Sequence, residues 1–249
     1  MSKTKMKKKR KLNYLVLFLM LFVGMYFVVT NFAEYAKSSK FFTIKKIKIE
    51  GNRYLSQSYL RSVADSFKGE NIFQVDEDDV HLRFQALSRV KEVKSKRAFP
   101  STLIFTITER HGVFYVKDEK GEYYPIDQEM IVLDKSDWYL NENIPLINIS
   151  IPKANIQVGK HISDHRVDLV FTTLNEMKRN SPLIINDISE FYFKNNDLYF
   201  IDDKSGCRVL VNIDNIASQL SRFIFLRNNQ GFDKNSTIDL RFETHVIIL

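Results

Sequence analysis

The chain has 249 residues, of which 44% are hydrophobic and 27% are charged, a composition that predicts a folded protein and excludes a disordered one. Its formal net charge of +7 comes from residues 1–11, which contain seven Lys and Arg and no acidic residue. The remaining 30 basic residues balance the 30 acidic ones, so the charge does not indicate nucleic-acid binding. The chain has a single cysteine, so it cannot form an internal disulfide. It also has no cluster of cysteines that would indicate a zinc or iron–sulfur site.

Residues 12–33 contain no charge, and as a helix they span about 33 Å, enough to cross a bilayer core of about 30 Å. A cleavable signal peptide needs a shorter apolar region and a small-x-small cleavage site, so we expect a retained transmembrane helix. Seven cations precede it, against five lysines at 37–48, which predicts a cytoplasmic tail at residues 1–11 and an extracytoplasmic remainder.

Residues 34–40 are predicted to be a linker, and residues 41–110 a first domain with the order β-α-α-β-β. The expected strand starts with Phe42 and Ile44 and has a phase slip at Lys45-Lys46. Ser56 is placed to cap the first helix and Asp76 the second. The buried stripes are Leu60, Val63, Ala64 and Phe67 in the first helix, and Val80, Phe84 and Leu87 in the second. Strands are expected at Val93–Phe99 and Leu103–Arg110, joined at Pro100-Ser101.

Residues 111–249 are predicted to form a second, mostly antiparallel β domain with two helices, which makes the fold α+β. Strands are expected at residues 113–116, 123–126 and 130–133, and helices at 164–179 and 213–225. Two hairpins should turn at residues 195–197 and 204–206. The last expected strand covers residues 237–249, with Ile238, Leu240 and Phe242 on one face and Asp239, Arg241 and Glu243 on the other.

No catalytic machinery is visible in the sequence. It lacks a Gly-rich phosphate loop, a Gly-x-Ser-x-Gly elbow and a His-Glu-x-x-His helix. His161 and His165 are spaced like metal ligands, but they straddle a predicted helix start, which favours a solvated position. Cys207 is in phase with Val209 and predicts a small buried thiol. We therefore expect no catalytic, cofactor or metal site and no small-molecule substrate.

Four segments in order along the chain resemble the FtsQ/DivIB family of bacterial cell division proteins. They are IKIEGNRYLS at residues 47–56, ENIFQVD at 70–76, FPSTLIFTITER at 99–110 and IDLRFETHVII at 238–248. The chain departs from the family where His111-Gly112-Val113-Phe114 replaces the usual proline and small residue before an aromatic. The resemblance implies that residues 41–110 form a POTRA domain and residues 111–249 an FtsQ-type β domain.

The resemblance also implies a function, that of a non-enzymatic scaffold of the divisome that links early and late division proteins at the septum. Its cytoplasmic-membrane topology would be single-pass, with the N-terminus inside. The implied partners are an FtsB–FtsL pair, with FtsW- and FtsI-like proteins as further candidates. The pair would add a strand to an exposed C-terminal edge. The residues that match this edge are Asp239, Leu240, Arg241, Phe242, Glu243 and Thr244. Arg241 has a second interpretation, as a salt-bridge donor within its own sheet.

Two other functional classes are compatible with an anchored chain of this kind. A membrane-tethered envelope enzyme would need a pocket with convergent polar groups. A transport or assembly component bearing a POTRA domain would ordinarily continue into a transmembrane barrel, and no long set of alternating lipid-facing strands follows residue 111.

Overall fold

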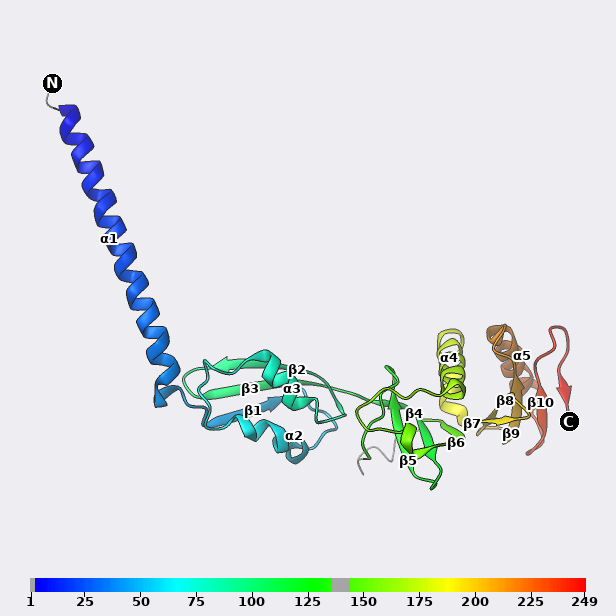
Figure 1. The fold of residues 1–249 in the computed structure, drawn as a ribbon. Coiled ribbons are helices and arrows are strands. Elements are labelled where there is room, and N and C mark those ends of the chain that lie inside the picture. The colour runs from blue at the N-terminus through cyan, green and yellow to red at the C-terminus, as the bar shows by residue number, and fades with distance from the viewer. Residues whose placement is uncertain (1–2, 136–143) are drawn as a thin grey trace. The chain divides into compact units, whose positions relative to one another are not determined.

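The computed structural model describes residues 3–135 and 144–249 (Figure 1). The chain divides into two compact units. The first contains residues 1–52, 56–84 and 92–107, and the second contains residues 53–55, 85–91 and 108–249.

Helix α1 (Lys3–Ser38) opens the first unit. Its segment Val16–Ser38 is long and apolar enough to cross a membrane, and no other helix among the described residues meets that test. The helix continues through residues 34–38, which the sequence predicts to be part of a linker. Thr30 and Asn31, two polar residues in the apolar stretch, bond to carbonyls one turn earlier, with Asn31 Nδ2 2.7 Å from the Phe27 oxygen. Each of the two side chains thus donates a hydrogen bond inside the helix.

The first unit has the predicted order β-α-α-β-β. Its elements are β1 (Lys46–Glu50), α2 (Gln57–Ala64), α3 (Glu77–Phe84), β2 (Val90–Ala98) and β3 (Thr102–Glu109). They build a sheet of order β1-β3-β2, in which β1 runs parallel to β3 with Ile47 opposite Leu103. Parallel neighbours need a crossover connection, which the two helices supply.

The prediction that β1 starts at Phe42 is wrong. Phe42 ends a short 3-10 helix, η1 (Lys40–Phe42), and the strand begins at Lys46. The backbone before the phase slip pairs instead with the loop between the helices, because Ile44 N donates to Glu70 O at 2.8 Å and Gly69 N to Ile44 O at 3.0 Å. The phase slip at Lys45-Lys46 therefore marks the point where the backbone changes its hydrogen-bonding partner, from the loop between the helices to β3.

The two helices cover the sheet with the predicted stripes. Ser56 caps α2, since its hydroxyl accepts from Tyr59 N at 3.1 Å. Phe67 and Phe84 both pack on Phe105 of β3. Their ring centroids lie 5.2 and 5.0 Å, respectively, from that of Phe105. Other buried apolar residues of this unit are Leu60, Ala64, Val80, Val93 and Leu103. Leu87 is also buried, but it follows the end of α3 and belongs to the second unit.

Two residues of the recognised motifs have clear structural reasons. Gly51 follows β1 with φ +84°, and a Cβ there would lie 2.6 Å from the backbone oxygen of Ile107, so only glycine fits. Within the second unit, the buried Glu109 carboxylate accepts backbone N–H bonds from Arg53 at 2.9 Å and Leu55 at 2.8 Å. It thereby fixes the turn that leads into α2.

The second unit is built on an eight-stranded sheet of order β11-β10-β9-β8-β7-β6-β4-β5. Its strands are β4 (Gly112–Asp118), β5 (Tyr123–Asp127), β6 (Leu146–Ile151), β7 (Ile188–Lys194), β8 (Asp197–Asp202), β9 (Cys207–Val211), β10 (Thr237–Asp239) and β11 (Ile247–Ile248). Four of the seven pairings among these described strands are antiparallel. The hairpins β7-β8 and β8-β9 confirm the two predicted turns.

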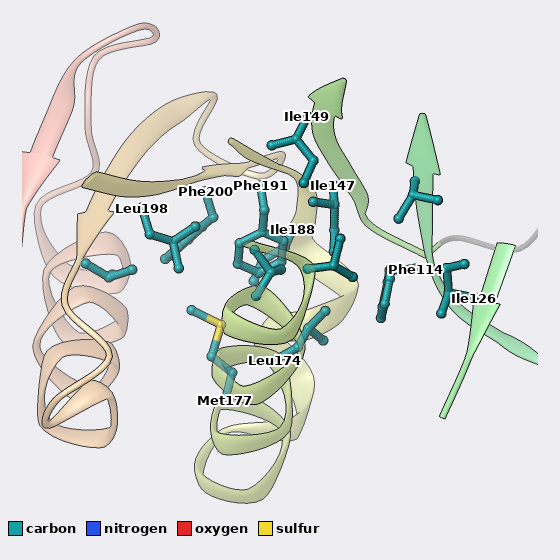
Figure 2. Packing of buried hydrophobic residues seen from close by; sticks show 14 of the residues in the cluster. Phe114, Ile126, Ile147, Ile149, Leu174, Met177, Ile188, Phe191, Leu198 and Phe200 are labelled. Carbon is teal, nitrogen blue, oxygen red and sulfur yellow. The ribbon is translucent and has the colours of Figure 1, made fainter. Parts of the chain in front are cut away.

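Helices α4 (His165–Asn180) and α5 (Ile216–Asn229) are the crossovers of two parallel pairs, β6 to β7 and β9 to β10. Asp164 caps α4 by accepting from Arg166 N at 2.9 Å. Leu174 and Met177 of α4 point at Phe191 and Ile147 of the sheet (Figure 2). Both helices are thus held by apolar residues that are buried against the strands.

Two expectations for the second unit are corrected. Residues 130–133 form only isolated bridges, Ile126 to Val132 and Ile131 to His161, rather than a strand. No strand is predicted at Leu146–Ile151, yet these residues form β6, which lies inside the sheet between β4 and β7. A central strand depends on neighbours that are distant in sequence, which local periodicity does not reveal.

Candidate functional site

The C-terminal edge of the large sheet is a hairpin and not the single strand predicted for residues 237–249. β10 ends at Asp239, and β11 returns antiparallel to it, with Ile238 opposite Ile248 and Asp239 opposite Ile247. Thr237 and Leu249 exchange two backbone bonds of 2.9 Å. β10 is therefore paired on both sides, by β9 and by β11, and the end of the sheet is β11 (Figure 1).

The chain leaves the strand because two local interactions take over after Asp239. Leu240 is fully buried, and its N–H donates to Leu210 O at 3.0 Å. The Asp239 carboxylate accepts from the backbone N–H of Arg241 at 3.1 Å, the arrangement of an Asx turn. These contacts turn the backbone away from the sheet.

Arg222 of α5 holds the loop between the two strands. Its guanidinium donates to the carbonyl oxygens of Leu240 at 3.0 Å and Glu243 at 2.6 Å, and to that of Phe242. Hydrogen bonds from a charged donor are stronger than neutral ones. One helical side chain thus fixes residues 240–243.

Arg241 bonds within its own sheet. Its guanidinium lies 2.8 Å from Asp239 Oδ2 and 3.0 Å from Asp197 Oδ1 at the start of β8. Burial by itself would raise the pKa of Asp239, but the bonds from the Arg241 side chain and backbone outweigh it and lower that pKa. Of the two interpretations of Arg241, the structure shows the salt bridge.

Among the strands of residues 3–135 and 144–249, β11 has a neighbour on one side only. Because Leu249 and Thr237 form a hydrogen-bonded pair, the residue between Leu249 and Ile247 directs its N–H and C=O away from β10. That residue is Ile248, whose side chain is 54% exposed. An edge of this kind is a template for strand addition.

A shallow apolar groove of about 510 Å³ borders this edge. Phe225 and Leu226 of α5 line one side, and His245, Val246 and Ile248 line the other. Phe242, 39% exposed, stacks on His245 with ring centroids 4.7 Å apart. Exposed apolar surface next to an open edge is typical of a protein-binding site.

The six residues matched from the sequence divide into two groups. Asp239 and Leu240 are buried, whereas Arg241, Phe242, Glu243 and Thr244 are exposed in the loop. The sequence reasoning missed Arg222, Phe225 and the β11 edge. The motif at residues 238–248 includes Ile248 and so was a signal for β11. No pattern in the sequence of α5 indicates that Arg222 reaches the loop.

The other residues that were considered for chemistry have structural surroundings. His161 lies in a bridge with Ile131 and His165 starts α4. No group of His, Cys, Asp and Glu suited to a metal occurs within residues 3–135 and 144–249. Cys207 is buried 2.9 Å from the Ser205 hydroxyl, and burial raises the pKa of its thiol, which confirms the prediction of a buried thiol.

The fold defines a POTRA-bearing protein with one apolar N-terminal helix and a β domain that ends in an open edge. Comparisons with known proteins agree: a family described as "POTRA domain, FtsQ-type" matches residues 42–110, and "Cell division protein FtsQ/DivIB, C-terminal" matches residues 114–241. The chain belongs to the FtsQ/DivIB family of cell division proteins.

Three relatives that match most of the chain are distant from it in sequence. A cell division protein DivIB of Clostridium acetobutylicum is 23% identical over 210 residues, which cover 82% of this chain and 81% of the relative. A cell division protein FtsQ of Syntrophotalea carbinolica is 23% identical and covers 80% and 67%, respectively. A cell division protein FtsQ of Rickettsia bellii is 22% identical and covers 80% and 69%.

Proposed function

We propose that the protein is a non-enzymatic scaffold of the divisome that binds an FtsB–FtsL-like pair by strand addition to β11. The observation that carries the proposal is the open edge at Ile248 beside the groove lined by Phe225 and His245. Main-chain bonds to the edge would supply affinity, and the groove would select side chains of the added strand. The sequence-matched residues Phe242, Glu243 and Thr244 flank this site, while Asp239 and Leu240 support it from inside.

The proposed topology places residues 1–11 in the cytoplasm and both folded units outside it, in the bacterial cytoplasmic membrane at the septum. The uncharged run and the cation excess before it support this orientation. A reporter that is active only outside the cytoplasm should work when it is fused after Leu249. An active cytoplasmic reporter at that junction would reverse the proposed orientation.

The binding proposal is tested with two proline variants of the full chain in nanodiscs and an FtsB-like peptide. Ile248→Pro removes the outward N–H but none of the bonds between β10 and β11, so it should abolish peptide binding and leave the thermal midpoint near wild type. Leu249→Pro is the matched control, because it removes the inward N–H that bonds to Thr237. It should loosen the hairpin.

A further variant tests the aromatic surface that Phe242 forms with His245 beside the groove. Phe242→Ala should weaken binding by about 2 kcal/mol, a factor of roughly 30, if Phe242 is a hot spot. Normal binding by both Ile248→Pro and Phe242→Ala would show that the C-terminal hairpin is not the docking site. Depletion of the protein should give filamentous, undivided cells. Normal division after depletion would contradict a divisome role.

A further inference from the structure

Four phenylalanines gather on the surface of the first unit, outside its core. The ring centroid of Phe42 lies 5.1 Å from that of Phe41 and 5.0 Å from that of Phe73. The ring centroids of Phe73 and Phe99 are 5.0 Å apart. We call these four residues the aromatic cluster. Phe41 and Phe99 are 64% and 57% exposed. Large aromatic side chains grouped in water indicate a surface that meets something apolar.

Three separate segments supply the cluster. Phe41 and Phe42 come from η1, Phe73 from the loop between α2 and α3, and Phe99 from the turn between β2 and β3. The loop is held in place by Asn71, whose Oδ1 accepts from Phe73 N at 2.9 Å. A convergence of three segments is a property of the folded unit rather than of one exposed loop.

The cluster is tied closely to the apolar helix. Phe41 is three residues beyond Ser38, where α1 ends, so the chain allows it at most about 10 Å from that end. The Asn71 amide also donates to the carbonyls of Ala36 at 2.9 Å and Ser39 at 3.3 Å. These bonds link the loop of Phe73 to the last turn of the helix.

Unpaired cations border the same region. Lys37, Lys40, Lys45 and Lys46 are exposed, and within residues 3–135 and 144–249 none of them forms an ion pair. The backbone N–H groups of Lys45 and Lys46 donate to Ser101 O at 2.9 and 3.2 Å, which places these lysines at the turn that carries Phe99. Cations around an apolar patch complement anionic phosphates.

We infer that the aromatic cluster inserts into the interfacial layer of the bilayer that holds α1, while the surrounding lysines contact phospholipid phosphates. Phenylalanines on an apolar face bordered by lysines bury at the boundary between headgroups and acyl chains, and the short tether makes this contact intramolecular. The inference rests on the membrane anchoring in the proposed function. It adds a second attachment, which would fix the face that the POTRA unit turns to the membrane.

The test uses the full chain in nanodiscs of phosphatidylcholine and phosphatidylglycerol with brominated acyl chains, which quench nearby tryptophan. Trp138→Phe first removes the one native tryptophan. Phe99→Trp then reports on the cluster, and Phe41→Trp is a second probe if the first variant misfolds. Phe225→Trp, at a site 65% exposed in the second unit, is the matched control. Phe22→Trp reports on the anchor itself.

We expect emission from positions 22 and 99 to be quenched and emission from position 225 to persist. Lys45→Gln with Lys46→Gln, or discs without phosphatidylglycerol, should reduce quenching at position 99 and leave it unchanged at position 22. Quenching at position 22 without quenching at position 99 would overturn the inference but not the membrane anchoring of α1. The aromatic cluster would then be a surface for a protein partner. Equal quenching at positions 99 and 225 would also overturn it, and an unquenched position 22 would refute the anchor.

Discussion

Arg222→Met tests whether one helical arginine holds the C-terminal hairpin. Methionine keeps much of the aliphatic stem of Arg222 but removes its bonds to the carbonyls of Leu240, Phe242 and Glu243. Phe242 and Glu243 are exposed, so water can replace the bonds to their carbonyls. The Leu240 carbonyl belongs to a buried residue and would lose its charged partner.

The free energy of opening the hairpin should therefore fall by about 1.5–3 kcal/mol, the contribution of one hydrogen bond to a charged group. At about 1.4 kcal/mol per tenfold change, amide exchange of Thr237 and Leu249 should accelerate by roughly tenfold to a hundredfold. Exchange in β7 should change little, since the carbonyls to which Arg222 donates belong to the loop and not to that strand.

Arg179→Met is the matched control, because among the described residues the side chain of Arg179 in α4 bonds only to Glu176, in an exposed bridge of 2.8 Å. An exposed pair of this kind contributes about 0.5 kcal/mol or less. Equal exchange rates of Thr237 and Leu249 in Arg222→Met and Arg179→Met would refute the reasoning. The pairing of β10 with β11 would then be sufficient to hold the hairpin.

Three further changes test the fold. Gly51→Ala should destabilise the first unit by more than about 1 kcal/mol, because both the positive φ and the backbone oxygen of Ile107 oppose a Cβ. Gly69→Ala shares the positive φ but meets no atom within 4 Å, so in chemical denaturation it should cost less than Gly51→Ala; equal costs would exclude the clash. Bonds from Lys135, Tyr124 and Lys153 lower the pKa of Glu122 from 4.5 to about 2, so its stabilising contribution is present above pH 4.5 and lost as the pH falls towards 2. Glu122→Gln should flatten that limb of a stability–pH curve, and an unchanged limb would contradict the assignment. Leu240→Ala should lower the free energy of unfolding by about 2–5 kcal/mol, as for a buried leucine, whereas a cost below about 0.5 kcal/mol would mean that Leu240 faces solvent.

Local patterns were sufficient for the parts of the fold whose physics is local. The apolar run before Glu34 determines a long helix by composition alone. The cap at Ser56 and the apolar stripe that follows it determine where α2 lies, and the helical periodicity of residues 164–179 predicts α4. The turns at residues 195–197 and 204–206 determine the two hairpins, because turn chemistry brings neighbouring strands together.

Only the tertiary structure decided the features that join distant segments. β6 pairs in parallel with β4 and β7, and pairing across a crossover leaves no local turn signal. The alternation of residues 237–249 predicts one strand, but the buried Leu240 and the bonds from Arg222 break it into a hairpin and move the open edge to β11. The aromatic cluster likewise exists only after folding, since Phe42, Phe73 and Phe99 come from three segments that the sequence keeps apart.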